Sequence, residues 1–289
     1  MTDEVASVLP PARTAAGAVG LDAIVSDPSG AVIGLDFDGT LSPIVPDPAS
    51  ARVHPEAPGV LAELGPMVGA IVVLTGRPAA VAIEYGASPG PGPGLTDVPG
   101  LVVLGQYGAE RWEAGEVTSP PPPRGVDAVR GALPGVLLSL GVRDAYIEDK
   151  GRALAVHTRR SADPDATLGA LRGPLARLAR EHGLTVEPGK MVIELRPPGV
   201  DKGHALRAFL AERGARSVLF AGDDLGDLAA YNAVRESGLP GVTVCSRSHE
   251  TAPELADRAD LIVEGPDGVV ALLRALTRVL GKGQAAQYG

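Results

Sequence analysis

Short apolar runs recur along the chain and alternate with longer segments of helical spacing. The runs end in polar turns, which predicts buried β-strands at residues 31–37, 70–75, 101–104, 217–221, 241–245 and 260–263. The spacing predicts helices at residues 15–25, 57–68, 201–213, 225–234, 250–257 and 267–280. Strands that alternate with helices in this order favour right-handed crossovers, so these parts of the chain predict a parallel sheet covered by helices.

The pattern changes after the proline run at residues 119–123. A helix followed by two strands is now predicted twice, with helices at 125–140 and 163–182 and strands at 143–148, 153–158, 184–187 and 191–195. This arrangement predicts a small α/β domain with a mostly antiparallel sheet, inserted into the first domain. We therefore predict an α/β core from residues 1–110 and 199–289 and an inserted α/β domain from residues 111–198. We expect the tail at 281–289 to be frayed.

Charge and composition narrow the classes of partner. The 289-residue chain has a formal net charge of −9, whereas nucleic acid and anionic membranes are bound by clustered Lys and Arg. We expect neither as a partner, and we expect a monomer. A small anionic substrate remains compatible with this charge if a metal ion or local positive charge offsets the acidic field.

Cysteine usage and the first residues bear on the compartment. Cys245 is the single cysteine, so no disulfide can form within the chain, and its apolar neighbours favour a core position over a reactive thiol. The first residues carry Asp3 and Glu4 where a signal peptide would carry Lys or Arg. No stretch is long and apolar enough to span a membrane, and we expect a cytoplasmic protein.

Carboxylates gather where the predicted parallel strands end. Asp36 and Asp38 lie at the end of the first strand, and Asp223 and Asp227 follow the strand at 217–221. Ligands bind at this edge of an open parallel sheet. Adjacent carboxylates repel one another unless a cation lies between them, and oxygen ligands suit a hard divalent ion such as Mg²⁺. The sequence therefore predicts a magnesium site at this edge.

A phosphate group fits beside such an ion. Thr75 and Lys202 would bind its oxygens, and the backbone at Gly39 could approach closely because glycine has no side chain. Taken singly, each feature has a simpler explanation. Asp38-Gly39 is a common turn, Thr75 and Asp223 could cap helices, and Lys202 could lie on the surface. Their common position at strand ends favours a phosphate site over these separate explanations.

Four segments resemble the motifs of the haloacid dehalogenase (HAD) superfamily of phosphatases, in the same order. They are DFDGTL at 36–41, LTGR at 74–77, DKG at 201–203 and GDDLGD at 222–227. Four others resemble trehalose-6-phosphate phosphatases: GQYGAE at 105–110, EDKG at 148–151, HTR at 157–159 and GKMVIELRP at 189–197. Gln106-Tyr107 departs from that likeness, because an Asn-His or Ser-His pair is more typical there. The role of this loop stays open.

The resemblance implies a Rossmann-like HAD core, a cap domain and a mechanism. Asp36 would attack phosphorus and form an aspartyl-phosphate, and Asp38 would protonate the departing sugar oxygen and later activate water. The implied ligands of Mg²⁺ are Asp36, the carbonyl of Asp38, Asp223 and, through water, Asp227. The implied phosphate-binding residues are Gly39, Thr75, Gly76 and Lys202.

The resemblance also implies a sugar site in the inserted domain. Glu148, Lys150 and Glu194 would bind sugar hydroxyls, which both donate and accept hydrogen bonds. The alternative is a solvated sheet face with paired charges. Arg77 would orient its loop, contact the substrate or pair with a carboxylate, and Asp224 would either support the metal or cap a helix.

Other assignments remain open from the sequence. Another HAD phosphatase could act on sucrose phosphate, mannosyl-3-phosphoglycerate or a hexose phosphate. A non-catalytic module could bind a phosphosugar, although such a module would not need both Asp36 and Asp38. A phosphotransferase or mutase would retain the same motifs. The five histidines show no spacing of metal ligands, so we do not expect zinc.

Overall fold

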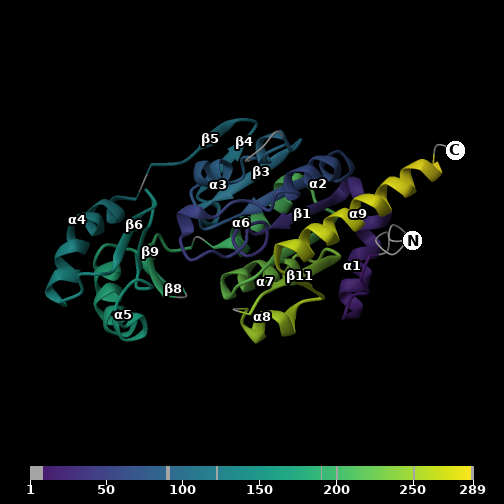
Figure 1. Ribbon diagram of the computed structural model, residues 1–289. Coiled ribbons are helices and arrows are strands. Elements are labelled where there is room, and N and C mark those ends of the chain that lie inside the picture. Colours follow the sequence, from purple (N-terminus) through teal and green to yellow (C-terminus); the bar gives the residue numbers. More distant parts are fainter. Residues whose placement is uncertain are drawn as a thin grey trace. The chain divides into compact units, whose positions relative to one another are not determined.

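A computed structural model of the protein describes residues 9–88, 92–121, 123–189, 191–199, 201–249 and 251–287. Pro122, Lys190 and Glu250, which belong to segments predicted above, and residues 1–8 lie outside these ranges. The chain forms two compact units (Figure 1). Unit 1 comprises Met1–Thr118 and Asp201–Gly289, and unit 2 comprises Ser119–Val200.

Unit 1 is built on an eight-stranded sheet of order β12-β11-β10-β1-β2-β3-β4-β5. Six strands run parallel: β1 (Ala31–Leu35), β2 (Ala70–Leu74), β3 (Leu101–Gly105), β10 (Ser217–Gly222), β11 (Gly241–Arg247) and β12 (Leu261–Glu264). Two strands at one edge, β4 (Glu110–Glu113) and β5 (Glu116–Thr118), are antiparallel. The predicted α/β fold with a mostly parallel sheet is confirmed.

Helices cover both faces of this sheet, which explains why its strands are continuous apolar runs. One face packs against α1 (Ala15–Ser26), α2 (Ala57–Leu64), α3 (Ala79–Tyr85) and α9 (Gly265–Gln287). The other packs against α6 (Lys202–Arg213), α7 (Leu228–Glu236) and α8 (Pro253–Arg258). Successive strand residues serve opposite faces: Ile33 packs in the first cluster and Val32 in the second.

The boundaries between the two compact units differ from the domain boundaries that the sequence pattern predicts. Unit 1 continues to Thr118, whereas the pattern places the first division after residue 110. The reason is the β4–β5 hairpin, which extends the core sheet and buries Trp112 in the first apolar cluster. The second division follows residue 200 and the pattern places it after residue 198.

Several helix ends differ from the predicted ones. The helix predicted at 57–68 ends at Leu64, and Pro66 lies in the 3₁₀ turn Gly65–Met67. The helix predicted at 225–234 begins as the 3₁₀ turn Leu225–Asp227. Helix α9 continues to Gln287, so the frayed tail predicted from residue 281 is wrong over these residues. Further 3₁₀ turns lie at Pro28–Gly30, Pro48–Ser50, Leu95–Asp97 and Gln106–Gly108.

Unit 2 is a four-stranded antiparallel sheet with two helices. The strand order is β6-β7-β9-β8, with β6 (Tyr146–Asp149), β7 (Leu154–His157), β8 (Thr185–Gly189) and β9 (Val192–Arg196). Helices α4 (Arg124–Ser139) and α5 (Pro164–Glu181) form an apolar core with Val156 and Ile193 of the sheet. Within the described ranges of the whole chain, no helix combines the length and apolar character needed to cross a membrane.

Candidate active site

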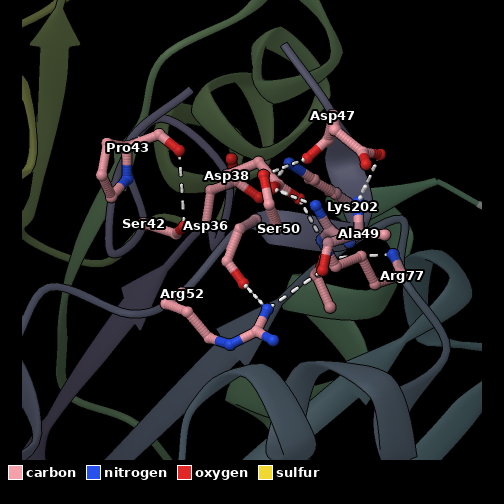
Figure 2. A network of polar contacts seen from close by, with 12 residues as sticks. Asp36, Asp38, Ser42, Pro43, Asp47, Ala49, Ser50, Arg52, Arg77 and Lys202 are labelled. Atoms are coloured by element: carbon pink, nitrogen blue, oxygen red, sulfur yellow. Dashed lines mark hydrogen bonds and ion pairs between the residues drawn. The ribbon is translucent and has the colours of Figure 1, made fainter. Parts of the chain in front are cut away.

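A buried lysine joins two of the predicted carboxylates. Asp36 directly follows β1, and its Oδ1 atom accepts a hydrogen bond of 2.6 Å from the Lys202 ammonium (Figure 2). Lys202 is the first residue of α6 and also donates to Asp227 Oδ1 at 2.7 Å. All three side chains are buried. The fold therefore brings together residues that lie far apart in the sequence, at the carboxyl edge of the sheet.

Asp223, which directly follows β10, completes a group of three carboxylates. One carboxylate oxygen from each of Asp36, Asp223 and Asp227 lies within 4.8 Å of the other two. Burial raises the pKa of Asp223 to about 10, and the charge of Asp36 adds to that effect. Burial also raises the pKa of Asp227, against the ammonium of Lys202. The charge of Lys202 therefore does not offset the cost of burying these carboxylates close together.

The charges on Asp36 and Lys202 depend on each other. Burial raises the pKa of Asp36 well above its usual range, although Lys202 opposes the effect. Burial alone would lower the pKa of Lys202, but the charges of Asp227 and Asp36 outweigh it and raise that pKa well above its ordinary value. One ammonium thus faces three carboxylates, and the oxygen-only donor set fits a hard divalent cation such as Mg²⁺.

Two glycines make this close packing of carboxylates feasible. Gly39 has a φ of 77°, and a Cβ atom there would lie 2.1 Å from Asp223 Oδ2. A Cβ atom at Gly222 would lie 2.3 Å from Asp227 Cγ. The Gly39 carbonyl also accepts a 2.6 Å hydrogen bond from Ser246 Oγ, a residue that the sequence analysis missed. The close approach of Asp223 therefore requires a residue without a side chain at position 39. This requirement is separate from the predicted role of Gly39 in phosphate binding.

Asp38 lies outside this carboxylate group and is held by Arg77 (Figure 2). Arg77 Nε donates to Asp38 Oδ2 at 2.8 Å, and Nη2 donates to Oδ1 at 2.7 Å. The guanidinium also lies over the ring of Tyr85, 4.9 Å from its centroid. Of the three roles considered for Arg77, the structure shows the pairing with a carboxylate. Each oxygen of Asp38 accepts one hydrogen bond from Arg77, and the further lone pairs of these oxygens stay available for a proton.

The segment after β2 forms a tight loop. Thr75 Oγ1 accepts a hydrogen bond of 3.1 Å from the Arg77 amide, and the Thr75 side chain is buried. The hydroxyl thus caps its own turn, and its oxygen retains the capacity to donate a hydrogen bond. The phosphate-binding roles of Thr75 and Gly76 stay predictions.

Two residues with open roles have a simple structural place. Asp224 Oδ1 accepts a 2.9 Å hydrogen bond from the Gly226 amide and caps the turn Leu225–Asp227, so of its two predicted roles the structure shows capping. Cys245 is buried in the second apolar cluster, which confirms the core position. Burial raises the pKa of its thiol to about 11.

The predicted sugar-binding residues lie on one face of the sheet of unit 2. Glu148 of β6 and Glu194 of β9 both lie opposite Ala155 of the strand between them, β7. The two glutamates therefore lie on either side of a small residue. Lys150 donates to Glu194 Oε2 at 2.5 Å. The other oxygen of Glu194 is buried and has no hydrogen-bond partner among the described residues. The face is thus polar and holds an unused acceptor.

His157, which belongs to the HTR segment at 157–159, also lies on this face. Its Nε2 atom lies 2.8 Å from Glu148 Oε2, and its ring lies 5.8 Å from that of Tyr146. The signal in the sequence was the spacing of two from Ala155 along β7, which places both residues on the same face. The contacts of this face therefore comprise paired charges and one buried acceptor that the described residues leave unused.

Known proteins are similar to this chain in sequence and in fold. Residues 141–261 match the family model described as trehalose-phosphatase. A protein of Sinorhizobium fredii named probable trehalose-phosphate phosphatase is 30% identical over 223 residues, which cover 75% of this chain and 79% of that protein. The chain belongs to the trehalose-phosphatase family.

Other members of the trehalose-phosphatase family are longer than this chain. The trehalose-phosphate phosphatase of Mycobacterium avium is 28% identical over 86% of this chain, and that match spans 62% of the mycobacterial protein. The trehalose-phosphate phosphatase of Mycobacterium leprae is 30% identical over 86% of this chain, and that match spans 58% of the mycobacterial protein. The chain therefore spans about three fifths of these mycobacterial relatives.

Solved structures support the fold of this trehalose-phosphatase family member. The C-terminal domain of C. albicans trehalose-6-phosphate phosphatase matches with a TM-score of 0.68 at 22% identity, over 94% of this chain and 98% of that one. A haloacid dehalogenase-like hydrolase from Bacteroides thetaiotaomicron matches with a TM-score of 0.56 at 16% identity, over 84% and 97%. At these identities the likeness establishes the predicted HAD-type architecture alone.

Proposed function

We propose that the chain hydrolyses trehalose 6-phosphate to trehalose and inorganic phosphate through an aspartyl-phosphate. The observation that carries the proposal is the buried pair of Asp36 and Lys202, with Asp223 and Asp227 beside it, in a member of the trehalose-phosphatase family. A buried carboxylate with one oxygen held by an ammonium is oriented for attack by the other.

Asp36 and Asp38 divide the chemistry between them. In the first step an oxygen of Asp36 bonds to phosphorus, the bond from phosphorus to the sugar oxygen breaks, and Asp38 gives that oxygen a proton. In the second step water bonds to phosphorus and loses a proton to Asp38, which releases phosphate and restores Asp36. Arg77 holds the Asp38 carboxyl group in place for these transfers through its two hydrogen bonds.

The proposed metal ligands are Asp36, Asp223, Asp227 and the carbonyl oxygen of Asp38. The three carboxylates fit a cation because, among the described residues, Lys202 alone contributes a buried ammonium to offset their charge. When bound, Mg²⁺ would neutralise charge on the transferring phosphoryl group. We propose that Gly39, Thr75, Gly76 and Lys202 bind the phosphoryl oxygens.

Glu148, Lys150 and Glu194 are the proposed sugar-binding residues. Glu194 keeps one buried oxygen without a hydrogen-bond partner among the described residues, and a sugar hydroxyl could donate to it. Lys150 already donates to the other oxygen, so this pair offers both a donor and acceptors to a hydroxyl-rich ligand.

Phosphate release from a panel of substrates tests the proposal. The panel is trehalose 6-phosphate, sucrose 6-phosphate, glucose 6-phosphate and mannosyl-3-phosphoglycerate, each with Mg²⁺ and with EDTA. We expect trehalose 6-phosphate to have the highest kcat/KM and EDTA to abolish the activity. Preference for another sugar phosphate would keep the chemistry and reject the proposed sugar site. The absence of release from all four would reject the proposed enzyme and favour a binding module or a phosphotransferase.

A further inference from the structure

Two consecutive residues after β3 have an unusual backbone. Gln106 and Tyr107 have φ values of 46° and 59°. The left-handed region is costly for residues with a Cβ atom, and such strain is concentrated at functional sites. Ala114 and Met191 also have positive φ values. They lie between the paired strands β4 and β5 and the paired strands β8 and β9, where tight turns often require this conformation.

The strained turn is bonded to the loop that follows β2. The Gln106 amide donates to the Arg77 carbonyl at 2.8 Å, and the Tyr107 amide donates to the Thr75 carbonyl at 2.9 Å. These two bonds hold the residues on either side of Gly76. A Cβ atom at Gly76 would lie 2.7 Å from the Tyr107 hydroxyl oxygen, so the phenol packs directly against the glycine.

A carboxylate fixes the turn to the same loop a second time. Gln106 Nε2 donates to Glu110 Oε1 at 2.7 Å, and Glu110 Oε2 accepts a 2.9 Å hydrogen bond from the Ala79 amide. Glu110 thereby connects the strained turn to the start of α3. The loop from Thr75 to Ala79 is held by backbone bonds, by this carboxylate and by the phenol.

Arg77 lies in the middle of this loop, and its side chain binds Asp38. Arg77 engages both oxygens of Asp38, at 2.8 and 2.7 Å. A shift of the Arg77 backbone would move its guanidinium and therefore the carboxyl group that it holds. We propose that Tyr107 is a positioning residue, which acts through Gly76 and Arg77 to place Asp38 for proton transfer to the leaving group. The inference rests on the proposed role of Asp38.

A positioning role predicts a loss that depends on the leaving group. As the Asp36–phosphorus bond forms and the bond to the leaving oxygen breaks, the proton moves from Asp38 to that oxygen. Phenolate needs this proton, whereas p-nitrophenolate is stable enough to depart without it. Since kcat/KM reports the steps up to departure of the leaving group, a misplaced Asp38 lowers it selectively for phenyl phosphate.

The test measures kcat/KM of the full chain with Mg²⁺ for phenyl phosphate and p-nitrophenyl phosphate. Tyr107→Asn retains a residue that tolerates the left-handed backbone and removes the ring. We expect a loss of about tenfold or more for phenyl phosphate and less than about threefold for p-nitrophenyl phosphate. Tyr107→Phe removes only the hydroxyl at Gly76 and should show the same selectivity at smaller size.

The matched control is Ala114→Asn, which introduces the same side chain at a left-handed residue between β4 and β5. It should leave both kcat/KM values unchanged. Equal losses of Tyr107→Asn on both substrates would show general distortion of the site and overturn the proposal, as would the absence of any loss. Neither probe contains a sugar, so rejection of trehalose 6-phosphate as the substrate would leave this test intact.

Discussion

Asp223 and Asp260 are buried carboxylates of the same core sheet with opposite surroundings. Asp260 directly precedes β12 and accepts hydrogen bonds from the Thr243 amide at 2.7 Å, from Arg235 at 2.6 Å and from the Thr14 hydroxyl. Asp223 directly follows β10, and the described residues donate no hydrogen bond to its carboxylate. Its close neighbours are the carboxylates of Asp36 and Asp227.

The two surroundings shift the two pKa values in opposite directions. Burial alone would raise the pKa of Asp260, but the hydrogen bonds from Thr14, Thr243 and Arg235 outweigh it and hold the pKa below its ordinary value. Burial raises the pKa of Asp223 to about 10. Asp260, whose carboxylate accepts hydrogen bonds within the protein, is suited to stabilising the fold. Asp223, whose carboxylate accepts none from the described residues, is suited to binding a cation.

The largest effect on activity is expected from Asp36, which belongs to the same carboxylate group as Asp223. Asp36→Asn removes the proposed nucleophile, and we expect kcat for phosphate release to fall by about 10⁴-fold or more. The exposed Asp22 on α1 supplies the control Asp22→Asn, which should retain full activity. Activity of Asp36→Asn within tenfold of the parent would mean that another group attacks phosphorus.

Asp260→Asn should cause the largest loss of stability. It leaves the Arg235 guanidinium without its partner and weakens the contacts to Thr14 and Thr243. We expect the free energy of unfolding at neutral pH to fall by about 3 kcal/mol, measured by urea denaturation. Asp22→Asn again serves as the control. An effect no larger than that control would show that the saturated carboxylate is not a stabilising element.

The pH dependence gives the sign of the Asp260 contribution. Its folded pKa is depressed, so its stabilisation is present above the unfolded pKa and is lost as pH falls through the folded value. The difference in unfolding free energy between the parent and Asp260→Asn should therefore shrink below about pH 4. A difference that grows as pH falls would contradict the assignment.

Asp223→Asn should have the opposite effect on stability in the presence of EDTA. Because the folded pKa of Asp223 is raised to about 10, the native state binds more protons than the unfolded state between about pH 4 and that value. Stability of the metal-free parent therefore falls as pH rises through this range. Asp223→Asn should raise the free energy of unfolding at pH 8 by about 1–2 kcal/mol.

Mg²⁺ sharpens the same test. It should stabilise the parent, because a ligand that binds only the native state raises the free energy of unfolding. Asp223→Asn should lose most of this gain, whereas Asp260→Asn should keep it. Thermal denaturation with Mg²⁺ and with EDTA measures all three proteins, and equal gains for both variants would place the cation elsewhere.

Glu194 of unit 2 lies between Asp260 and Asp223 in the number of hydrogen bonds that it accepts. Lys150 donates to one of its oxygens, and the described residues donate none to the other. Glu194→Gln should raise KM for the preferred sugar phosphate about fivefold, because one charge-assisted hydrogen bond is lost, with little change in kcat. The exposed Glu181 at the end of α5 provides the control Glu181→Gln. An unchanged KM for Glu194→Gln would favour a face of paired charges without sugar.

The alternation of apolar runs and helical spacing was enough to predict the parallel sheet of unit 1 and the antiparallel sheet of unit 2. The same reasoning missed the β4–β5 hairpin, because Glu110–Glu113 and Glu116–Thr118 are charged and short. Their strand conformation depends on the edge of β3, a neighbour that local spacing does not reveal. Asp36, Lys202, Asp223 and Asp227 were found because each lies beside a strand end or a helix start.

The sequence by itself determined which side chains reach the carboxyl edge of the core sheet, since strand ends and residue types are local properties. Only the tertiary structure decided their partners. It paired Arg77 with Asp38, Lys202 with Asp36 and Asp227, and the strained turn at Gln106 and Tyr107 with the loop after β2. The physical reason is that charge interactions and hydrogen bonds depend on distances between segments remote in sequence, which folding alone brings within 3 Å.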